Sequence, residues 1–199
     1  MNKSTRISRA RVAMLIALAA LSIPVAYAEQ VGAPSGFKEY CSTRVVPECG
    51  GVRNRDADTR STVYSDLSFV NSHVNYHMVY QRDRLTYGKE EHWADPKNWI
   101  GDCEDSVLKK LHYLYKAGWS EKDLRIATAF FYDNKPPVAL VALGPKAANH
   151  AVLIATYDGV DYVLDSAADP VLTVDDFTQL YGAKITSIQT KGGKWTTYN

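Results

Sequence analysis

The chain has 199 residues, with 23 Lys and Arg against 22 Asp and Glu and 46% hydrophobic residues. The near-neutral balance gives no sign of a nucleic-acid-binding surface. About 170 residues beyond the N-terminal segment are enough for one domain with its own core, which makes a second domain unnecessary.

The first 28 residues have the pattern of a secretory signal peptide. Four basic residues precede an apolar stretch over 12–23, and Ala26-Tyr27-Ala28 has the small residues of a cleavage site. A retained membrane anchor is the alternative, but an apolar run of about 12 residues falls short of the roughly 20 that cross a bilayer. We therefore expect 1–28 to be a cleaved signal peptide, 29–199 to be the mature domain, and the protein to be periplasmic.

Three cysteines follow in an exported chain, so one is left over after any single disulfide. Cys41 and Cys49 are eight residues apart in a segment with Pro47, Gly50 and Gly51, and can close a short loop. Cys103 is then the unpaired thiol. The alternative is three free, buried thiols.

The mature chain divides into an irregular arm, a helical part and a run of strands. Residues 29–60 show no sustained period and predict an irregular N-terminal arm. Apolar spacing predicts helices over 66–80, 103–117 and 173–181, and Val-, Ile- and aromatic-rich runs predict strands over 124–132, 138–143, 150–157, 162–164 and 184–190. Lys109, Lys110 and Lys116 are expected to lie off the apolar stripe of the second helix. Helices first and antiparallel strands afterwards indicate an α+β fold.

Cys103 is placed where a loop becomes a helix, in the string Asp102-Cys103-Glu104-Asp105. Unpaired N–H groups and the helix dipole favour a thiolate at that position. Three neighbouring carboxylates oppose it. Either they point into solvent, or Asp102 and Glu104 hold a hard cation such as calcium that restores a positive field near the sulfur.

A second pair of residues comes from a predicted hairpin. Asp158-Gly159 is typical of a two-residue turn, which would pair Tyr157 with Val160 and, further along the strands, bring His150 and Asp165 onto one face as diagonal neighbours about 7 Å apart. A slip of one residue would separate them. The alternative is a His and an Asp at strand ends with no joint role.

Together these residues make a thiol, a base and an orienting acid in the order Cys, His, Asp. The segments 101–105, 149–153 and 163–165, with 41–49, 70–75 and 87–96 upstream, resemble the bacterial transglutaminase-like cysteine peptidases, the family of the LapG-type adhesin-releasing periplasmic proteases. The chain departs from the family pattern at Ser166, where Asn is frequent, and at Ser106, where an aromatic residue is common.

The resemblance implies a papain-like α+β core with Cys103 as nucleophile, His150 as general base and acid, and Asp165 orienting His150. It also implies calcium at Asp102 and Glu104, no organic cofactor, a secreted adhesin as substrate and an inner-membrane cyclic-di-GMP receptor as partner.

Two other functions fit the same residues. A transglutaminase would pass the thioester of Cys103 to a lysine amine instead of water. An inactive periplasmic module would use an aromatic cleft, with Trp93 and Trp99 near Cys103, to hold a peptide.

Overall fold

The computed structural model describes residues 28–44, 46–50, 64–131, 150–190 and 193–198. Residues 1–27 of the expected signal peptide and the strand expected over 138–143 lie outside these residues. Within them, no helix combines the length and apolar character that crossing a bilayer requires.

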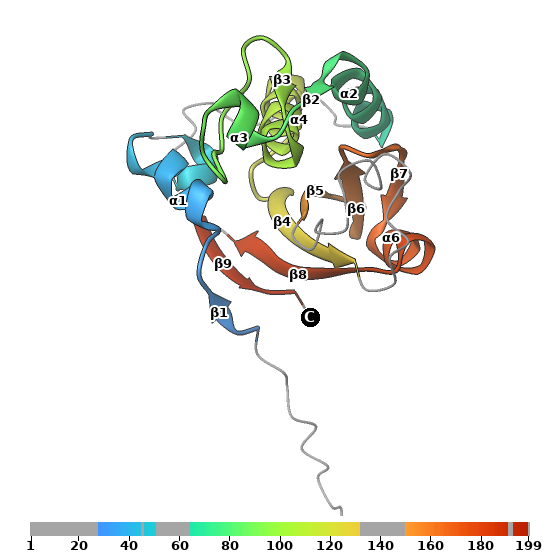
Figure 1. Ribbon diagram of the computed structural model, residues 1–199. Helices are drawn as coiled ribbons and strands as arrows, with labels where there is room; N and C mark the ends of the chain where they lie inside the picture. The colour runs from blue at the N-terminus through green and yellow to red at the C-terminus, as the bar shows by residue number, and fades with distance from the viewer. Residues whose placement is uncertain (1–27, 45, 51–63, 132–149, 191–192, 199) are drawn as a thin grey trace, which may run out of the picture.

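A seven-stranded sheet forms the frame of the domain (Figure 1). In spatial order its strands are β1 (Gln30–Val31), β9 (Lys194–Thr197), β8 (Ala183–Thr190), β4 (Leu124–Phe131), β5 (His150–Tyr157), β6 (Val160–Asp165) and β7 (Ala168–Thr173). Every neighbouring pair is antiparallel. With the helices that precede it, this sheet confirms the predicted α+β class.

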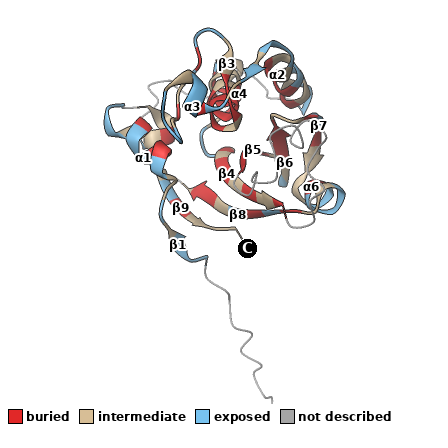
Figure 2. Cartoon of the chain, in the orientation of Figure 1, coloured by how far each residue is buried: buried red, intermediate tan, exposed pale blue. Residues whose placement is uncertain are grey.

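Helices cover both faces of the sheet. On one face lie α2 (Tyr64–His77) and α4 (Cys103–Ala117), and on the other lies α6 (Val174–Tyr181). Alternate residues of β5 therefore belong to different cores: Leu153 packs with α4, whereas Val152 and Ile154 pack with Phe177 of α6. Because both faces are covered, β5 is buried from His150 to Ala155, and the residues after His150 form a continuous apolar run, as Figure 2 shows for the centre of the sheet.

Smaller elements surround the start of α4. A two-stranded parallel pair joins β2 (Val79–Tyr80) to β3 (Ile100–Gly101), and α3 (Asp83–Thr86) follows β2. β3 ends at the residue before the N-cap of α4. The pairing of β2 with β3 therefore places α3, which follows β2, close to the start of α4.

The prediction of an irregular arm was wrong in part. Residues Ser35–Ser42 form the helix α1, and Pro47–Cys49 form a 3-10 turn. α1 has a Pro N-cap without a side-chain cap and no acidic residue in its first turn, so the usual start signals are missing from the sequence. It is held instead by tertiary contacts, with Phe37 packed against Trp93 and Trp195.

β7 was also not predicted from the sequence. It contains Pro170, which argues against a strand in the interior of a sheet. The strand is compatible with proline because β7 is at the edge and pairs only with β6.

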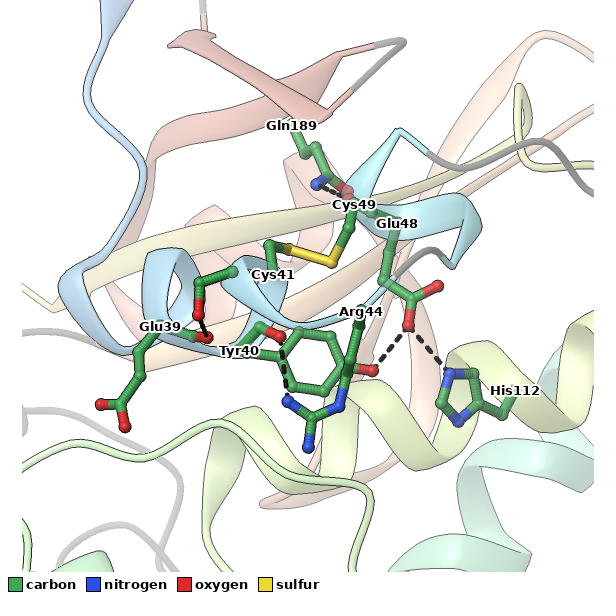
Figure 3. The surroundings of a disulfide bond; sticks show 9 residues. Glu39, Tyr40, Cys41, Arg44, Glu48, Cys49, His112 and Gln189 are labelled. Atoms are coloured by element: carbon green, nitrogen blue, oxygen red, sulfur yellow. Dashed lines mark hydrogen bonds and ion pairs between the residues drawn. A yellow bond between two sulfur atoms is a disulfide. The ribbon is translucent and has the colours of Figure 1, made fainter.

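The disulfide expected between Cys41 and Cys49 is present and closes the end of α1 onto the 3-10 turn (Figure 3). Next to it, the buried Glu48 accepts a hydrogen bond from the Tyr40 hydroxyl at 2.8 Å. The Gln189 side chain donates to the Glu48 carbonyl at 2.6 Å. The arm is thereby fixed to strand β8.

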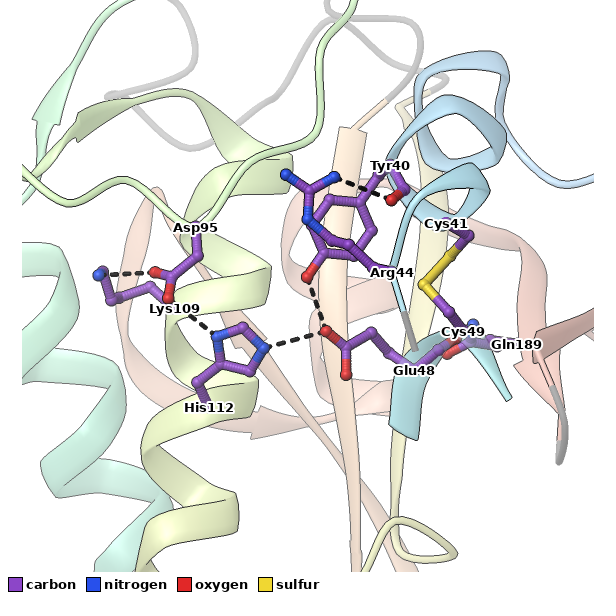
Figure 4. A network of polar contacts seen from close by, with 9 residues as sticks. All are labelled: Tyr40, Cys41, Arg44, Glu48, Cys49, Asp95, Lys109, His112 and Gln189. Carbon is purple, nitrogen blue, oxygen red and sulfur yellow. Dashed lines mark hydrogen bonds and ion pairs between the residues drawn. A yellow bond between two sulfur atoms is a disulfide. The ribbon is translucent and has the colours of Figure 1, made fainter. Parts of the chain in front are cut away.

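His112 connects the arm to α4 (Figure 4). Its Nε2 lies 3.0 Å from Glu48 Oε1 and its Nδ1 3.1 Å from Asp95 Oδ2, and Asp95 also pairs with Lys109 at 2.6 Å. Both ring nitrogens face carboxylates, so both carry protons. Burial acts to lower the pKa of His112, but hydrogen bonds to Asp95 and Glu48 outweigh it and raise this pKa to about 9.

This network predicts a pH-dependent contribution to stability. The folded pKa of His112 exceeds its unfolded value of about 6.5, so the contribution is complete below pH 6.5 and is lost as pH rises through about 9. The pKa of Asp95 is lowered by His112, so acid removes the contribution as well. We expect His112→Gln to cost about 2 kcal/mol more at pH 6 than at pH 10 in urea unfolding, after allowance for partial exposure. Equal costs at both pH values would contradict a charged His112.

Candidate active site

Cys103 is the first residue of α4, and its thiol is free. Asp102 is the N-cap, with extended backbone, and its carbonyl accepts the Ser106 N–H at 3.0 Å. The helix therefore starts at the expected residue, and the first N–H groups of a helix have no partner within the helix itself. The thiol donates to Glu104 Oε2 at 3.1 Å, while the backbone N–H of Ala151 on β5 points at the sulfur.

His150 and Asp165 meet as the hairpin predicted. Asp158 and Gly159 both have positive φ, of 50° and 77°, as a type I′ turn requires. Tyr157 pairs with Val160 and Leu153 with Leu164, so the predicted register is confirmed. His150 Nε2 lies 2.6 Å from Asp165 Oδ1, and both side chains are buried, at 3% and 2% exposure.

The environment of Asp165 favours its ionised form. Burial alone would raise the pKa of this carboxyl, but the neighbouring His150 ring, the Lys110 side chain and the Ala167 N–H hold it below its usual value. A carboxylate here accepts a hydrogen bond from the Nε2–H of His150. The other ring nitrogen, Nδ1, is then available to accept a proton.

Cys103 and His150 line one cleft of about 630 Å³, together with Ala151, Tyr80 and Trp93. The thiol comes from a helix N-terminus and the imidazole from the adjacent strand end, because α4 packs directly on β5. Trp99, expected near Cys103, packs instead on His77 and Tyr113 and does not line this cleft.

The carboxylates flanking Cys103 do not point into solvent. Asp102 is 8% exposed, Glu104 7% and Asp105 0%, which makes the expectation of ordinary first-turn acids wrong. Asp105 accepts the Ala94 N–H at 2.8 Å, and burial raises its pKa to about 8. Burial raises the pKa of both Asp102 and Glu104, and the charge of Asp102 raises the pKa of Glu104 further.

A fourth buried acid, Asp83, belongs to the same cluster. Its N–H donates to Asp102 Oδ2 at 3.3 Å, and burial together with Asp102 raises the pKa of its carboxyl to about 6. Asp83 was not predicted from the sequence because it lies 19 positions before Asp102. Only the parallel pairing of β2 with β3 brings the two together, and two short parallel strands leave no periodic signal.

The acid cluster fits a hard cation. Carboxylate oxygens of Asp83, Asp102 and Asp105 lie within 4.8 Å of one another, and Asp102 with Glu104 and Cys103 forms an overlapping group. Asp83 Oδ1 and Asp102 Oδ1 are buried and have no hydrogen-bond partner within the described residues. Several oxygen ligands with spare lone pairs are what calcium prefers.

When the acid cluster carries its full negative charge, it opposes the formation of a thiolate at Cys103. Burial raises the pKa of the thiol well above its usual value, and the charges of Glu104 and Asp102 raise it further. A thiolate at this position therefore needs compensating positive charge.

Comparison with known proteins identifies the family. The model of the bacterial transglutaminase-like cysteine proteinases matches residues 27–198. This chain belongs to that family. It is accordingly a cysteine-type peptidase, and its mixed helix and antiparallel-sheet fold is the transglutaminase-like one.

Solved structures of LapG from Legionella pneumophila agree with this placement. The calcium-bound form is 24% identical over 69% of this chain and 70% of that chain, with a TM-score of 0.51. The EGTA-treated form is 25% identical over 70% of each chain, with a TM-score of 0.51. No curated protein gave a significant match.

Gly101, the first residue of the Gly-Asp-Cys-Glu-Asp string, is required by close packing. A Cβ at this position would collide with the Asp105 side chain. We expect Gly101→Ala to lower the free energy of unfolding by about 1–3 kcal/mol, because Asp105 is itself fully buried. Gly32→Ala is the control, since a Cβ there meets only Lys38 Nζ at 3.6 Å. Equal thermal midpoints for the two variants would argue against this packing.

Proposed function

We propose that this peptidase cleaves a protein substrate through a Cys103–His150–Asp165 triad. The observation that carries the proposal is the 2.6 Å contact between His150 and the buried Asp165, together with the cleft that His150 shares with Cys103, the only thiol outside the disulfide among the described residues. A nucleophile and a base in one cleft, with an orienting group hydrogen-bonded to the base, are the parts that acyl transfer through a thioester needs.

In the proposed mechanism, His150 Nδ1 takes the Cys103 proton while Asp165 holds the opposite ring nitrogen. The thiolate adds to the peptide carbonyl, and the backbone N–H groups at the start of α4 stabilise the oxyanion. The C–N bond then breaks as His150 returns the proton to the leaving amine. Water, deprotonated by His150, hydrolyses the thioester and regenerates the thiol.

Calcium is part of the proposal. Asp102 and Glu104 would hold it, joined by Asp83 and Asp105, and its charge would offset the carboxylates next to the sulfur. Support comes from the buried oxygens without partners and from the LapG structures, which are described as calcium-bound and EGTA-treated. A carboxylate cluster neutralised in this way no longer opposes a thiolate at Cys103.

The substrate, partner and location are proposed from the family resemblance. A large secreted adhesin is the proposed substrate, and an inner-membrane cyclic-di-GMP receptor the proposed regulator. The protein would act in the periplasm after removal of residues 1–28, whose sequence has the signal-peptide pattern.

Replacing the nucleophile tests the triad. We expect Cys103→Ala to abolish release of surface proteins from cells that lack the natural chain, with a thermal midpoint close to that of the wild type. Ser187→Ala is the control, because this residue lines the cleft outside the triad. Mass spectrometry of the released proteins should find hydrolysed termini. Release by Cys103→Ala would exclude this nucleophile, and isopeptide crosslinks in place of new termini would indicate a transglutaminase.

Calorimetric titration of calcium into EGTA-treated protein tests the acid cluster. We expect one site in the wild type and at least tenfold weaker binding in both Asp102→Asn and Asp83→Asn, since each removes a charged ligand. Asp175→Asn, an exposed acid on α6, should bind as the wild type does. The absence of heat in the wild type would reject the calcium site, and unchanged affinity in both variants would reject its placement.

A further inference from the structure

The outer face of α2 carries two histidines that the proposed function does not use. α2 lies on the outside of the domain, and its inner face, with Val70 and Val74, packs against α4 and the sheet (Figure 1). That covering also encloses Lys110 of α4, so the expectation that this lysine lies off the buried stripe was wrong. His73 is half-buried and His77 is exposed, so solvent reaches both rings.

The two histidine rings lie next to each other because they are four residues apart on one helix. Their centroids are 4.3 Å apart, with an angle of 47° between the ring planes. A zinc ion lies about 2.0–2.1 Å from each imidazole nitrogen that it binds, so two such nitrogens are roughly 3–4 Å apart. The observed spacing therefore allows both rings to reach one ion.

A hydrogen bond to the backbone fixes the tautomer of His77. Its Nδ1 lies 2.8 Å from the carbonyl oxygen of His73. A carbonyl can only accept, so Nδ1 carries the proton of the neutral ring and Nε2 keeps a free lone pair. Metal-binding histidines commonly have this arrangement, in which one ring nitrogen donates to a carbonyl and the other binds the ion. Neither ring nitrogen of His73 has a hydrogen-bond partner among the described residues, so this ring can offer a lone pair as well.

Aromatic side chains restrict the movement of both rings. Phe69 stacks on His73 with the ring centroids 5.7 Å apart. Trp99 and Tyr113 contact the same ring at 5.7 Å and 5.3 Å. Trp99 also contacts His77 at 5.3 Å. The two imidazoles are therefore held side by side before an ion binds, which reduces the conformational entropy lost on binding.

We propose that His73 and His77 bind one first-row transition-metal ion of the zinc and copper type, through a ring nitrogen of His73 and Nε2 of His77. Imidazole nitrogens suit these ions, whereas calcium prefers oxygen ligands. Among the described residues no third His, Cys, Asp or Glu joins the pair, so water would complete the coordination. Neither histidine lines the cleft of Cys103, so this site is separate from the acid cluster in both place and chemistry.

The other three of the five histidines in the chain are placed differently. His112 has a carboxylate at each ring nitrogen, and His150 is buried in the proposed triad. His92 has a lysine ammonium 3.3 Å from its Nδ1, which disfavours a cation there. Two neighbouring imidazoles that are open to solvent are therefore found, within the described residues, on α2 alone.

The test follows the histidine ring signals by NMR while Zn²⁺ is added to the calcium-loaded Cys103→Ala protein, in which no free thiol competes for zinc. We expect the signals of His73 and His77 to shift together and to saturate at one equivalent of zinc. His73→Gln and His77→Gln should each weaken this binding at least about tenfold, because the second imidazole is held beside the first and acts at high effective concentration. His92→Gln is the matched control and should bind zinc as the parent protein does.

Thermal unfolding gives a second measurement on the same proteins. An ion that binds the folded chain raises the thermal midpoint, so zinc should raise it in the parent protein and in His92→Gln but not in His73→Gln or His77→Gln. Zinc affinity that is unchanged in both α2 variants, or ring shifts confined to His92 or His150, would mean that zinc binds elsewhere and would overturn the proposal. Neither readout needs peptide cleavage, so the result is independent of the proposed triad.

Discussion

The register of β5 against β6 is the constraint on which the candidate active site depends. The turn at Asp158 and Gly159 fixes it, and the strands transmit it over seven residues to His150 and Asp165. A slip of one residue would turn one of the two side chains into the core on the α6 face. The buried alternation of β5, with Leu153 toward α4 and Val152 toward α6, makes such a slip costly. Packing on both faces of the sheet therefore stabilises the register that the hydrogen bond between His150 and Asp165 requires.

The buried acids around the candidate active site need compensating groups. Asp83, Asp102, Glu104 and Asp105 surround the start of α4, where the chemistry needs a thiolate, and each has a raised pKa. Asp165 has a lowered pKa, with the His150 ring in contact with it. The proposed calcium would compensate the first set.

Local signals were enough to predict the parts of the site that lie close in sequence. The hairpin turn, the bounds of α4 at Cys103 and Ala117, and the Cys41–Cys49 disulfide follow from short-range chemistry, and the structure confirms them. The α+β class follows from the order of the elements.

Features that depend on contacts between separate helices and strands could not be predicted from these local signals. Asp83 reaches the acid cluster only through the pairing of β2 with β3, and Lys110 is buried only because α2 lies on α4. α1 lacks the usual helix start signals and is fixed by the packing of its side chains. β7 lacks the usual composition of a strand and is possible because it lies at the edge of the sheet. Sequence periodicity describes one helix or strand at a time, and these features belong to pairs of them.

The most direct test of the central claim is the pH dependence of Cys103 alkylation in the calcium-loaded wild type and in His150→Ala. A thiolate paired with the His150 imidazolium predicts a reactive plateau that begins well below pH 8 and disappears in the variant. A single titration near pH 8.5 or above in both proteins would mean that the sulfur and the ring do not act together, and the account would fail.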